Sequence, residues 1–561
     1  MIMSRTKIIA TIGPASFSQS VMKKMVKHGL SCVRINTAHV EPDYIGKVRK
    51  LVDSVNLIQG SHVSIMVDLK GPELRLSDFR SGDFSVKRGK EYTMSGINGN
   101  GDMKLNNDRV VETLEAGTVV KVNDGKVVFK VTDKKSDMLI LKALDTGSMK
   151  SHARVNIPGV ELDLGNVTER DMEFIRASVK EDVEHYAMSF VQNRKDVTEL
   201  EKILRSEGSN SGVVSKIETM AGYKNIRDIS MASEMIMVAR GDLGVELPLS
   251  EIGIAQKKII AETHRHGIPT ILATQILESM VTSPEPTRAE ILDITNAVFD
   301  SADILMLSEE SAIGKYPAES VMYLRSASEF AEGSLKNETE PEDFLGNKVA
   351  FSIARAAKAT VSLTSADGII AFTKNGNTAR MLSALRPEKD IFAVVTSHRL
   401  ARRLNLYYAV RPITIPESFA TSTDLAQLIK YLSENKNFSK GRRFVTLSGL
   451  PYFLYGGTND MRLVTMGEFI GRGYPTGKSI SGSVSLNPED RSDILIVNGS
   501  AYRDDYRIYK GIIFTGFPLQ QDMEKMKEKN ISVLSGAQFY RAIKNGENIF
   551  WDSATGIIIS S

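Results

Sequence analysis

Three short apolar runs, each ended by polar residues, lie between residues 213 and 280 and constrain the fold more than any other feature. The first run ends at Lys216 and Glu218, the second at Asp242 and the third at Thr274. Such runs, separated by helical patterns, indicate buried parallel strands. The carboxyl ends of these strands converge on the catalytic face of a β/α barrel. A lysine, two carboxylates and a hydroxyl on that face indicate a divalent metal and an anionic substrate.

The same alternation of strand and helix occurs on both sides of these runs. Predicted strands lie at residues 7–13, 32–36, 63–69, 185–190, 213–218, 235–239, 269–274 and 303–308. This makes about eight β/α units, the number that closes a barrel. Between residues 76 and 163 short β-like runs and glycine turns replace the pattern, which predicts a small β-barrel inserted after the third strand.

Later segments predict two further domains. A charged linker at residues 338–342 precedes an α/β domain, and another β/α segment completes the chain. We therefore expect the barrel at residues 1–75 and 164–342, the insert at 76–163, the α/β domain at 343–467 and the last domain at 468–561.

Composition narrows the classes of function. The 561 residues are too many for one ordinary core, and the net charge of +3 gives no reason to expect nucleic acid or a membrane surface as a partner. The single cysteine, Cys32, excludes an internal disulfide, and no signal peptide or membrane-length apolar run is found. We expect a cytoplasmic protein.

Several motifs identify a family resemblance. The sequences K-I-E-T at 216–219, M-V-A-R-G-D-L-G-V-E at 237–246 and A-T-Q-I-L-E-S-M at 273–280 closely resemble pyruvate kinase. V-N-D-G-K-V at 122–127, V-N-I-P-G at 155–159, P-E-P-T-R-A-E at 284–290 and Y-G-G-T-N-D-M-R at 455–462 also match. The resemblance runs from about residue 6 to about residue 467. The last segment resembles the swivelling phosphohistidine domain of phosphoenolpyruvate-utilising enzymes.

The resemblance implies a fold and an activity. The fold is a (β/α)8 TIM barrel with an inserted small β-barrel lid, a C-terminal α/β domain and an extra swivelling β/α domain. The activity is transfer of a phosphoryl group from phosphoenolpyruvate to ADP, which gives pyruvate and ATP in the last step of glycolysis. A homotetramer is also implied.

Site residues follow from the matched motifs. From the residues alone, Glu218 and Asp242 are either ion-paired carboxylates or metal ligands, and Lys216 either pairs with Glu218 or stabilises a transferring anion. The resemblance implies that Glu218 and Asp242 bind Mg²⁺ or Mn²⁺ and that Lys216 is catalytic. The backbone of Gly241 and Asp242 begins a helix and can bind a carboxylate. Thr274 either bonds the local backbone or, as the resemblance implies, lies on the proton path.

Two basic motifs add phosphate ligands. In R-I-N-T-A-H and D-L-K-G-P-E-L-R, Arg34 and Arg75 can grip phosphates through their planar guanidinium groups. The resemblance implies that both are catalytic, that Arg34 also binds substrate, and that Asn36, His39 and Arg75 bind the nucleotide.

Departures from the family motifs concern K⁺ and motivate a rival function. The family's K⁺-ligating serine is Ala38 here, and its threonine is Leu69, which could still offer a backbone carbonyl. Because Asn36, Asp68 and Glu73 remain, we expect K⁺ to bind through Asn36, Asp68 and Leu69. Together with Glu309, which replaces a glycine, Ala38 and Leu69 motivate a non-catalytic, effector-binding paralogue. Another phosphoenolpyruvate-dependent barrel is disfavoured by the lid and the α/β domain.

Two features concern regulation. Between a strand and a helix lie Thr373, Lys374, Asn375, Gly376, Asn377 and Thr378, which form either an ordinary capped loop or a phosphate site for a phosphorylated effector. The last histidine is His398, so the terminal domain cannot carry phosphohistidine, and we expect a structural or regulatory role for it.

Overall fold

The computed structural model describes the chain except residues 1–3, 80–82, 124, 136–137, 161–164, 166, 336–339, 343, 345, 420–423, 436, 450–456 and 561. It divides into two compact units: Met1–Gly346 with Arg380–Arg386 and Ser397–Pro412, and Asn347–Ala379 with Pro387–Thr396 and Ile413–Ser561. Parts of the 338–342 linker and of the 455–462 motif, and residue 163 at the end of the predicted insert, lie outside the described residues. The domain boundaries stay predictions.

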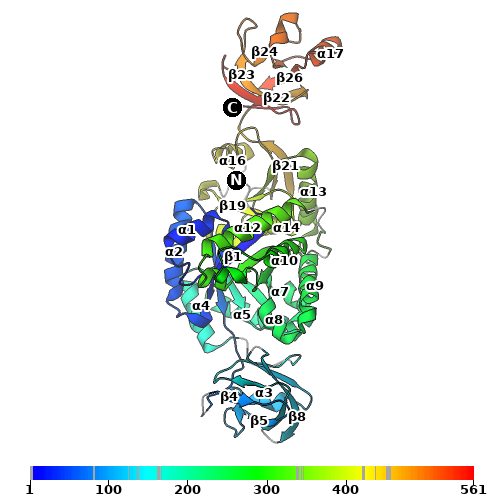
Figure 1. The fold of residues 1–561 in the computed structure, drawn as a ribbon. Coiled ribbons are helices and arrows are strands. Elements are labelled where there is room, and N and C mark those ends of the chain that lie inside the picture. Colours follow the sequence, from blue (N-terminus) through cyan, green and yellow to red (C-terminus); the bar gives the residue numbers. More distant parts are fainter. Residues whose placement is uncertain are drawn as a thin grey trace. The chain divides into compact units, whose positions relative to one another are not determined.

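A closed barrel of eight parallel strands forms the centre of the first unit (Figure 1), which confirms the predicted fold. Glu218 and Thr274, predicted as strand ends, lie one residue beyond strands β13 and β15. The strands, in their order around the barrel, are β1 (Lys7–Thr11), β16 (Ile304–Leu307), β15 (Thr270–Ala273), β14 (Met235–Ala239), β13 (Gly212–Ile217), β12 (His185–Met188), β3 (Ser64–Leu69) and β2 (Leu30–Asn36).

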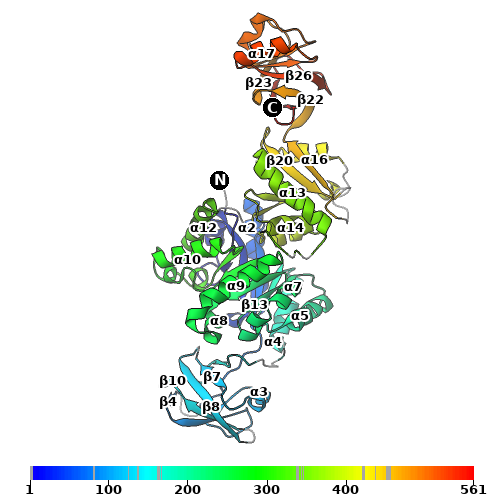
Figure 2. The same cartoon turned by 90° about the vertical axis from the view of Figure 1, so that its right-hand side faces the viewer.

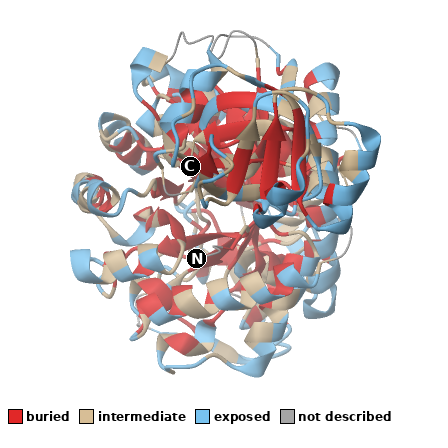
Figure 3. Cartoon of the chain, turned by 90° about the horizontal axis from the view of Figure 1, so that it is seen from above, coloured by how far each residue is buried: buried red, intermediate tan, exposed pale blue. Residues whose placement is uncertain are grey.

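Helices surround the barrel strands, and their apolar faces are buried while their outer faces are exposed (Figures 2 and 3). Local signals explain where they begin. Thr168 accepts a hydrogen bond from the Asp171 amide at 3.1 Å, and the Asp171 carboxylate accepts one from the Thr168 amide at 3.0 Å. This capping box fixes the start of helix α4 (Glu169–Lys180). The main helices are α1 (Gln19–Lys27), α2 (Tyr44–Gln59), α4 (Glu169–Lys180), α5 (Arg194–Ser206), α7 (Ile226–Ala232), α8 (Arg240–Glu246), α9 (Ile252–Arg265), α10 (Arg288–Phe299) and α12 (Pro317–Gly333).

The insert has its own hydrophobic core and forms a half-barrel lid. Six of its strands make one sheet, two make another, and helix α3 (Asp108–Thr113) packs beside them. The large sheet has the order β11 (Val155–Asn156), β7 (Val119–Val122), β8 (Val127–Lys135), β9 (Met138–Ala143), β5 (Glu91–Ser95) and β6 (Met103–Lys104), and the small one pairs β10 (Gly147–Met149) with β4 (Phe84–Val86).

The rest of the chain forms an α/β sheet and a second closed barrel. The five-stranded sheet has the order β19 (Val410–Thr414), β18 (Ile391–Val395), β17 (Gly368–Phe372), β20 (Arg443–Ser448) and β21 (Asp460–Thr465), with helices α13 (Lys348–Thr364), α14 (Asn377–Ala384), α15 (His398–Leu404) and α16 (Leu425–Leu432). The terminal barrel has the order β22 (Glu468–Thr476), β26 (Ser532–Phe539), β25 (Gly511–Phe514), β24 (Ile494–Val497), β23 (Ile480–Ser485), β27 (Asn548–Trp551) and β28 (Ile557–Ser560), with helix α17 (Gln520–Glu528). Within the described ranges, no helix is both long and apolar enough to cross a membrane.

Buried carboxylates lie just before three strands of the first barrel, at Glu184, Glu234 and Asp303. Glu234 has the densest set of partners. Its Oε1 accepts hydrogen bonds from Arg403 Nε at 2.6 Å, Tyr407 Oη at 2.9 Å and Arg380 Nη2 at 3.2 Å, and its Oε2 lies 3.2 Å from His185 Nδ1. Burial opposes ionisation, but the positive charges around it hold the pKa of Glu234 well below its ordinary value. This ion-pair cluster ties α14 and α15 residues to the amino end of β14.

We predict that Glu234→Gln lowers the free energy of unfolding at pH 7 by about 3 kcal/mol, because it leaves two partly buried guanidinium groups without their counter-ion. The pKa of Glu234 is depressed in the folded state, so its contribution is present above the unfolded-state pKa of about 4.3 and is lost as pH falls towards the lower folded value. The difference between the two proteins should therefore narrow below about pH 4.

Urea denaturation from pH 7 to pH 3 measures this difference. Glu173→Gln is the control, because Glu173 pairs with Arg170 at an exposed site where both side chains are about half exposed. Equal stability of wild type and Glu234→Gln at pH 7 would contradict the prediction.

Candidate active site

Lys216 lies at the carboxyl end of β13, where its side chain is only 12% exposed. Its ammonium lies 3.0 Å from Glu218 Oε1 and 3.2 Å from Asp68 Oδ1, and it donates a hydrogen bond to Ser189 Oγ at 2.8 Å. Burial alone would lower the pKa of Lys216, but the two carboxylates raise it above its ordinary value. The ammonium is therefore charged, buried and fixed by three acceptors.

Arg34 joins this cluster from the end of β2. Its Nε donates to Asp68 Oδ2 at 2.7 Å and its Nη1 to Thr11 Oγ1 at 2.9 Å. Burial opposes ionisation of Asp68, but the charges of Lys216 and Arg34 together lower its pKa. Asp68 thus holds two cationic side chains side by side, an arrangement that can receive a doubly charged anion.

Glu218 and Asp242 are the candidate metal ligands. Burial and the negative charge of Asp242 raise the pKa of Glu218 to about 7, although Lys216 opposes the rise. Glu218 Oε2 accepts the Phe190 amide at 2.8 Å, and Asp242 Oδ1 accepts Arg154 Nη1 of the lid at 2.5 Å. Burial opposes ionisation of Asp242, but Arg154 and Lys216 lower its pKa. Two neighbouring carboxylates suit a divalent cation, because Mg²⁺ takes few protein ligands. Within the described part of the chain, no group of three or more His, Cys, Asp or Glu could hold a metal ion.

Thr274 and Gly241 lie together at the ends of β15 and β14. The Gly241 amide donates to Thr274 Oγ1 at 3.0 Å, a hydrogen bond between residues that are 33 positions apart in the sequence. Thr274 has a positive φ of 67°, unusual for a β-branched residue. Buried Arg240 donates to the carbonyls of Thr274 and Gln275, at 2.7 and 2.8 Å from its Nη2. Arg240 holds this loop in a conformation that costs energy, which is a pattern of functional sites.

The predicted nucleotide residues lie in two places. Asn36 precedes a short 3-10 helix, Thr37–His39, in which His39 is exposed. Arg75 lies in the chain segment that leads into the lid, where its guanidinium contacts Glu73 and the His152 carbonyl. Among the described residues, no hydrogen bond joins the Arg75 guanidinium to Arg34 or Lys216.

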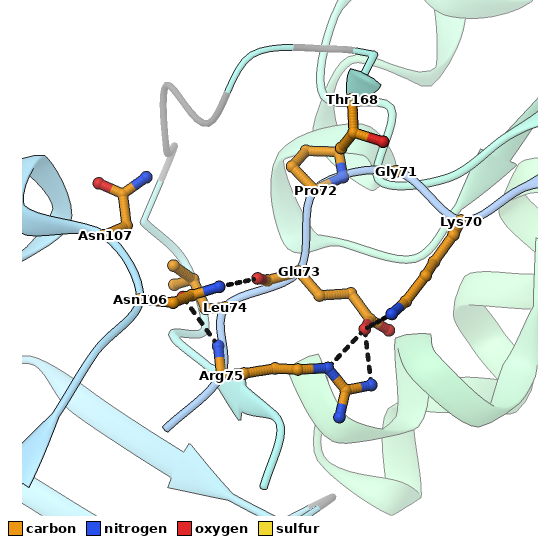
Figure 4. A pocket seen from close by; sticks show the side chains of 9 residues that line it. All are labelled: Lys70, Gly71, Pro72, Glu73, Leu74, Arg75, Asn106, Asn107 and Thr168. Atoms are coloured by element: carbon orange, nitrogen blue, oxygen red, sulfur yellow. Dashed lines mark hydrogen bonds and ion pairs between the residues drawn. The ribbon is translucent and has the colours of Figure 1, made fainter. Parts of the chain in front are cut away.

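A cavity of about 290 Å³ lies beside this connecting segment (Figure 4). Glu73 extends toward both Lys70 and Arg75, with ion pairs of 3.2 Å and 2.6 Å. The lining residues are Lys70, Gly71, Pro72, Glu73, Leu74, Arg75, Asn106, Asn107 and Thr168.

The three oxygen-bearing groups that are predicted to bind K⁺ already accept hydrogen bonds within the protein. Asn36 Oδ1 accepts the Ala38 amide at 3.2 Å, the Leu69 carbonyl accepts Ser189 Oγ at 2.8 Å, and Asp68 accepts Arg34 and Lys216. All three predicted ligands offer oxygen atoms, the type of ligand atom that K⁺ requires.

The departures and the effector loop have definite positions. Ala38 and Glu309 are exposed, and Glu309 is in the first turn of the short helix Glu309–Ala312. In the loop of the second unit, Thr373 and Thr378 are buried, while Lys374, Asn375 and Asn377 are exposed. The Gly376 amide donates to Thr373 Oγ1 at 3.0 Å, and Gly376 has a φ of 88°, which favours glycine.

Two residues of the site were missed from the sequence. Ser189 links Lys216 to the Leu69 carbonyl, and Arg240 supports Thr274. Ser189 falls inside the predicted strand 185–190, so the rule that places chemistry at strand ends could have found it. Arg240 directly follows the predicted strand 235–239, so the same rule could have found it.

A parallel barrel whose strand ends gather a buried lysine, an arginine and two facing carboxylates defines a class of protein, the β/α-barrel enzymes that act on anionic substrates. Two family models then specify the class. One, described as the barrel domain of pyruvate kinase, matches residues 3–321, and one described as its alpha/beta domain matches residues 352–464.

Individual relatives agree. A pyruvate kinase of Thermoplasma acidophilum is 43% identical over 556 residues, covering 99% of this chain and 98% of its own length. One of Staphylococcus aureus is 34% identical over 525 residues, covering 89% of this chain and 88% of its own. The crystal structure of a pyruvate kinase from Cryptosporidium parvum matches with a TM-score of 0.76 and 28% identity, covering 82% of this chain and 96% of its own.

The chain belongs to the pyruvate kinase family. This confirms the family and the enzyme class predicted from the sequence. No family model covers residues 468–561, but the Thermoplasma relative matches nearly the whole chain and so shares this segment.

Proposed function

We propose that this chain transfers the phosphoryl group of phosphoenolpyruvate to ADP and forms pyruvate and ATP. The observation that carries the proposal is the buried ammonium of Lys216, held among Asp68, Glu218 and Ser189 beside Arg34. During such a transfer negative charge develops on the enol oxygen as its bond to phosphorus breaks, and a fixed, desolvated cation stabilises this charge and that of the transferring phosphoryl group. Family membership supports the assignment.

In this proposal each side chain has a stated task. Arg34 and Lys216 bind the phosphoryl oxygens, and Arg75 with Asn36 and His39 binds the nucleotide phosphates. The backbone at Gly241 and Asp242 binds the substrate carboxylate. A nucleotide oxygen forms the new P–O bond as the bond to the enol oxygen breaks, and the enolate carbon then takes a proton from water relayed by Thr274.

The cations belong to the proposal as well. Glu218 and Asp242 would hold Mg²⁺ or Mn²⁺, which would neutralise phosphoryl and carboxylate charge when bound. Asn36, Asp68 and the Leu69 carbonyl would hold K⁺. Assembly as a homotetramer rests on the family resemblance, and a cytoplasmic location rests on the single cysteine. Binding of a phosphorylated effector at residues 373–378 rests on both the residues of that loop and the resemblance.

We predict that Lys216→Met lowers kcat by at least about a hundredfold, because the transition state loses its buried cation. Pyruvate formation from phosphoenolpyruvate, ADP and Mg²⁺ measures this. Wild-type protein that is folded and binds phosphoenolpyruvate without forming pyruvate would instead support the non-catalytic paralogue.

We predict that Ser189→Ala lowers kcat by roughly tenfold, because Lys216 loses one of three acceptors and can shift towards the carboxylates. Ser215→Ala is the matched control. Ser215 pairs with Ser233 at 2.6 Å in the same strand as Lys216, so it removes a buried hydrogen bond without touching the ammonium. Equal kinetic losses in both variants would contradict a specific role for Ser189.

We predict that K⁺ raises the activity and that Ala38→Ser lowers the K⁺ concentration needed, because serine restores a hydroxyl oxygen near Asn36. The measurement compares K⁺ with tetramethylammonium at constant ionic strength, which separates specific binding from screening. Activity that does not change on removal of K⁺ would refute the predicted site.

A further inference from the structure

The segment of residues 74–77, which connects β3 to the lid, is here called the hinge strand. Lid residues hold it on both sides. The Val155 amide donates to the Leu74 carbonyl at 2.8 Å and the Leu76 amide to the Ala153 carbonyl at 2.9 Å. On the other side the Ser77 amide donates to the Lys104 carbonyl at 2.8 Å.

On this second side Asn106 also bonds to the hinge strand, with both its backbone and its side chain. Its amide donates to the Arg75 carbonyl at 3.0 Å, its Oδ1 accepts the Arg75 amide at 3.0 Å, and its Nδ2 donates to the Glu73 carbonyl at 2.9 Å. The side-chain amide thus takes the place of a peptide group in a strand ladder and bridges residues 73 and 75 (Figure 4). One residue of the lid therefore fixes the backbone on both sides of Leu74.

The guanidinium of Arg75 depends on that backbone. Its Nε donates to Glu73 Oε2 at 2.8 Å, its Nη2 lies 2.6 Å from the same oxygen, and its Nη1 donates to the His152 carbonyl at 2.8 Å. Glu73 and Arg75 are the two residues whose backbone Asn106 joins. If that link is lost, the carboxylate and the guanidinium no longer keep their relative position.

The cavity beside the hinge strand makes the hydrogen bonds of Asn106 important for the position of Glu73 and Arg75. Because a cavity of about 290 Å³ borders Glu73 and Arg75, close packing does not hold them from that side. Arg75 is also 38% exposed, so polar contacts are its main constraint. The side chain of Asn106 contributes to this constraint by holding the backbone of residues 73 and 75.

We propose that Asn106 is a positioning residue for the nucleotide: it holds the hinge strand so that Arg75 presents its guanidinium to the phosphates of ADP. This inference rests on the proposed function, because it takes Arg75 as a nucleotide ligand. It adds a role in the reaction for a lid residue outside the matched motifs.

Asn107 offers a matched control in the next position. Its side chain accepts the Val110 amide at 3.3 Å and caps helix α3, and it also borders the cavity. This hydrogen bond joins the Asn107 side chain to the helix and not to residues 73–75. Asn107→Ala therefore disturbs the lid equally near the hinge without removing the bridge.

The experiment compares Asn106→Ala, Asn106→Asp and Asn107→Ala in the full chain. We expect Asn106→Ala to raise KM for ADP about tenfold, the factor for losing one or two exposed hydrogen bonds, with KM for phosphoenolpyruvate changed less than about twofold. Asn106→Asp keeps the acceptor for the Arg75 amide and loses the donor to Glu73, so its KM for ADP should be intermediate. Asn107→Ala should lower the melting temperature without changing either KM.

Hydrogen exchange separates this inference from the proposed function. In protein without substrate, Asn106→Ala should speed amide exchange in residues 73–77, whereas Asn107→Ala should speed it in α3. Wild-type protein without turnover would refute the proposed function alone, while the exchange result would still stand. Unchanged exchange at the hinge strand, or the same kinetic change in the Asn106 and Asn107 alanine variants, would overturn the proposal. If Asn106→Ala does not fold, Asn106→Asp gives the same comparisons.

Discussion

A buried ammonium at the end of β13 is the interaction on which the site depends. Lys216 would be unstable as a charged group at 12% exposure without Asp68, Glu218 and Ser189 around it. The same Asp68 carboxylate also binds Arg34. The result is a compact set of alternating charges whose positions are mutually fixed, and such fixed charges stabilise a moving anion without reorganising.

At the opposite end of the barrel, buried charged groups are also stabilised by ion pairs. Glu184 and Glu234 precede β12 and β14, and each is buried against arginines. At this end the ion pairs are closed, because the acceptors of Glu234 are filled by arginine, tyrosine and histidine. At the other end Asp242 is 28% exposed and turns towards the lid. Buried ion pairs therefore lie at both ends of the barrel, and the one at Asp242 is partly exposed beside the lid.

The apolar pattern predicted the barrel well because a strand that is buried on both faces consists of a continuous run of apolar residues. Residues 235–239 were predicted as a strand with the bounds that strand β14 has. Lys216, Glu218 and Asp242 were found because they lie at or just beyond the carboxyl ends of such strands. Contacts between distant segments leave no local pattern, so the contact of Arg240 with Thr274 and the bridge of Asn106 were not predicted. The insert's closure also depends on long-range pairing, and its described strands form a half-barrel.

The attachment of the lid shows how packing determines the direction of a functional side chain. Leu74 and Leu76 are buried in the lid core, at 5% and 1% exposure, and Arg75 lies between them. Successive side chains of an extended strand point to opposite faces, so burial of both leucines turns Arg75 away from the core. A shift of one residue would bury the guanidinium and expose both leucines. The lid's hydrophobic core thus sets the face on which Arg75 lies, and polar contacts need only set its position on that face.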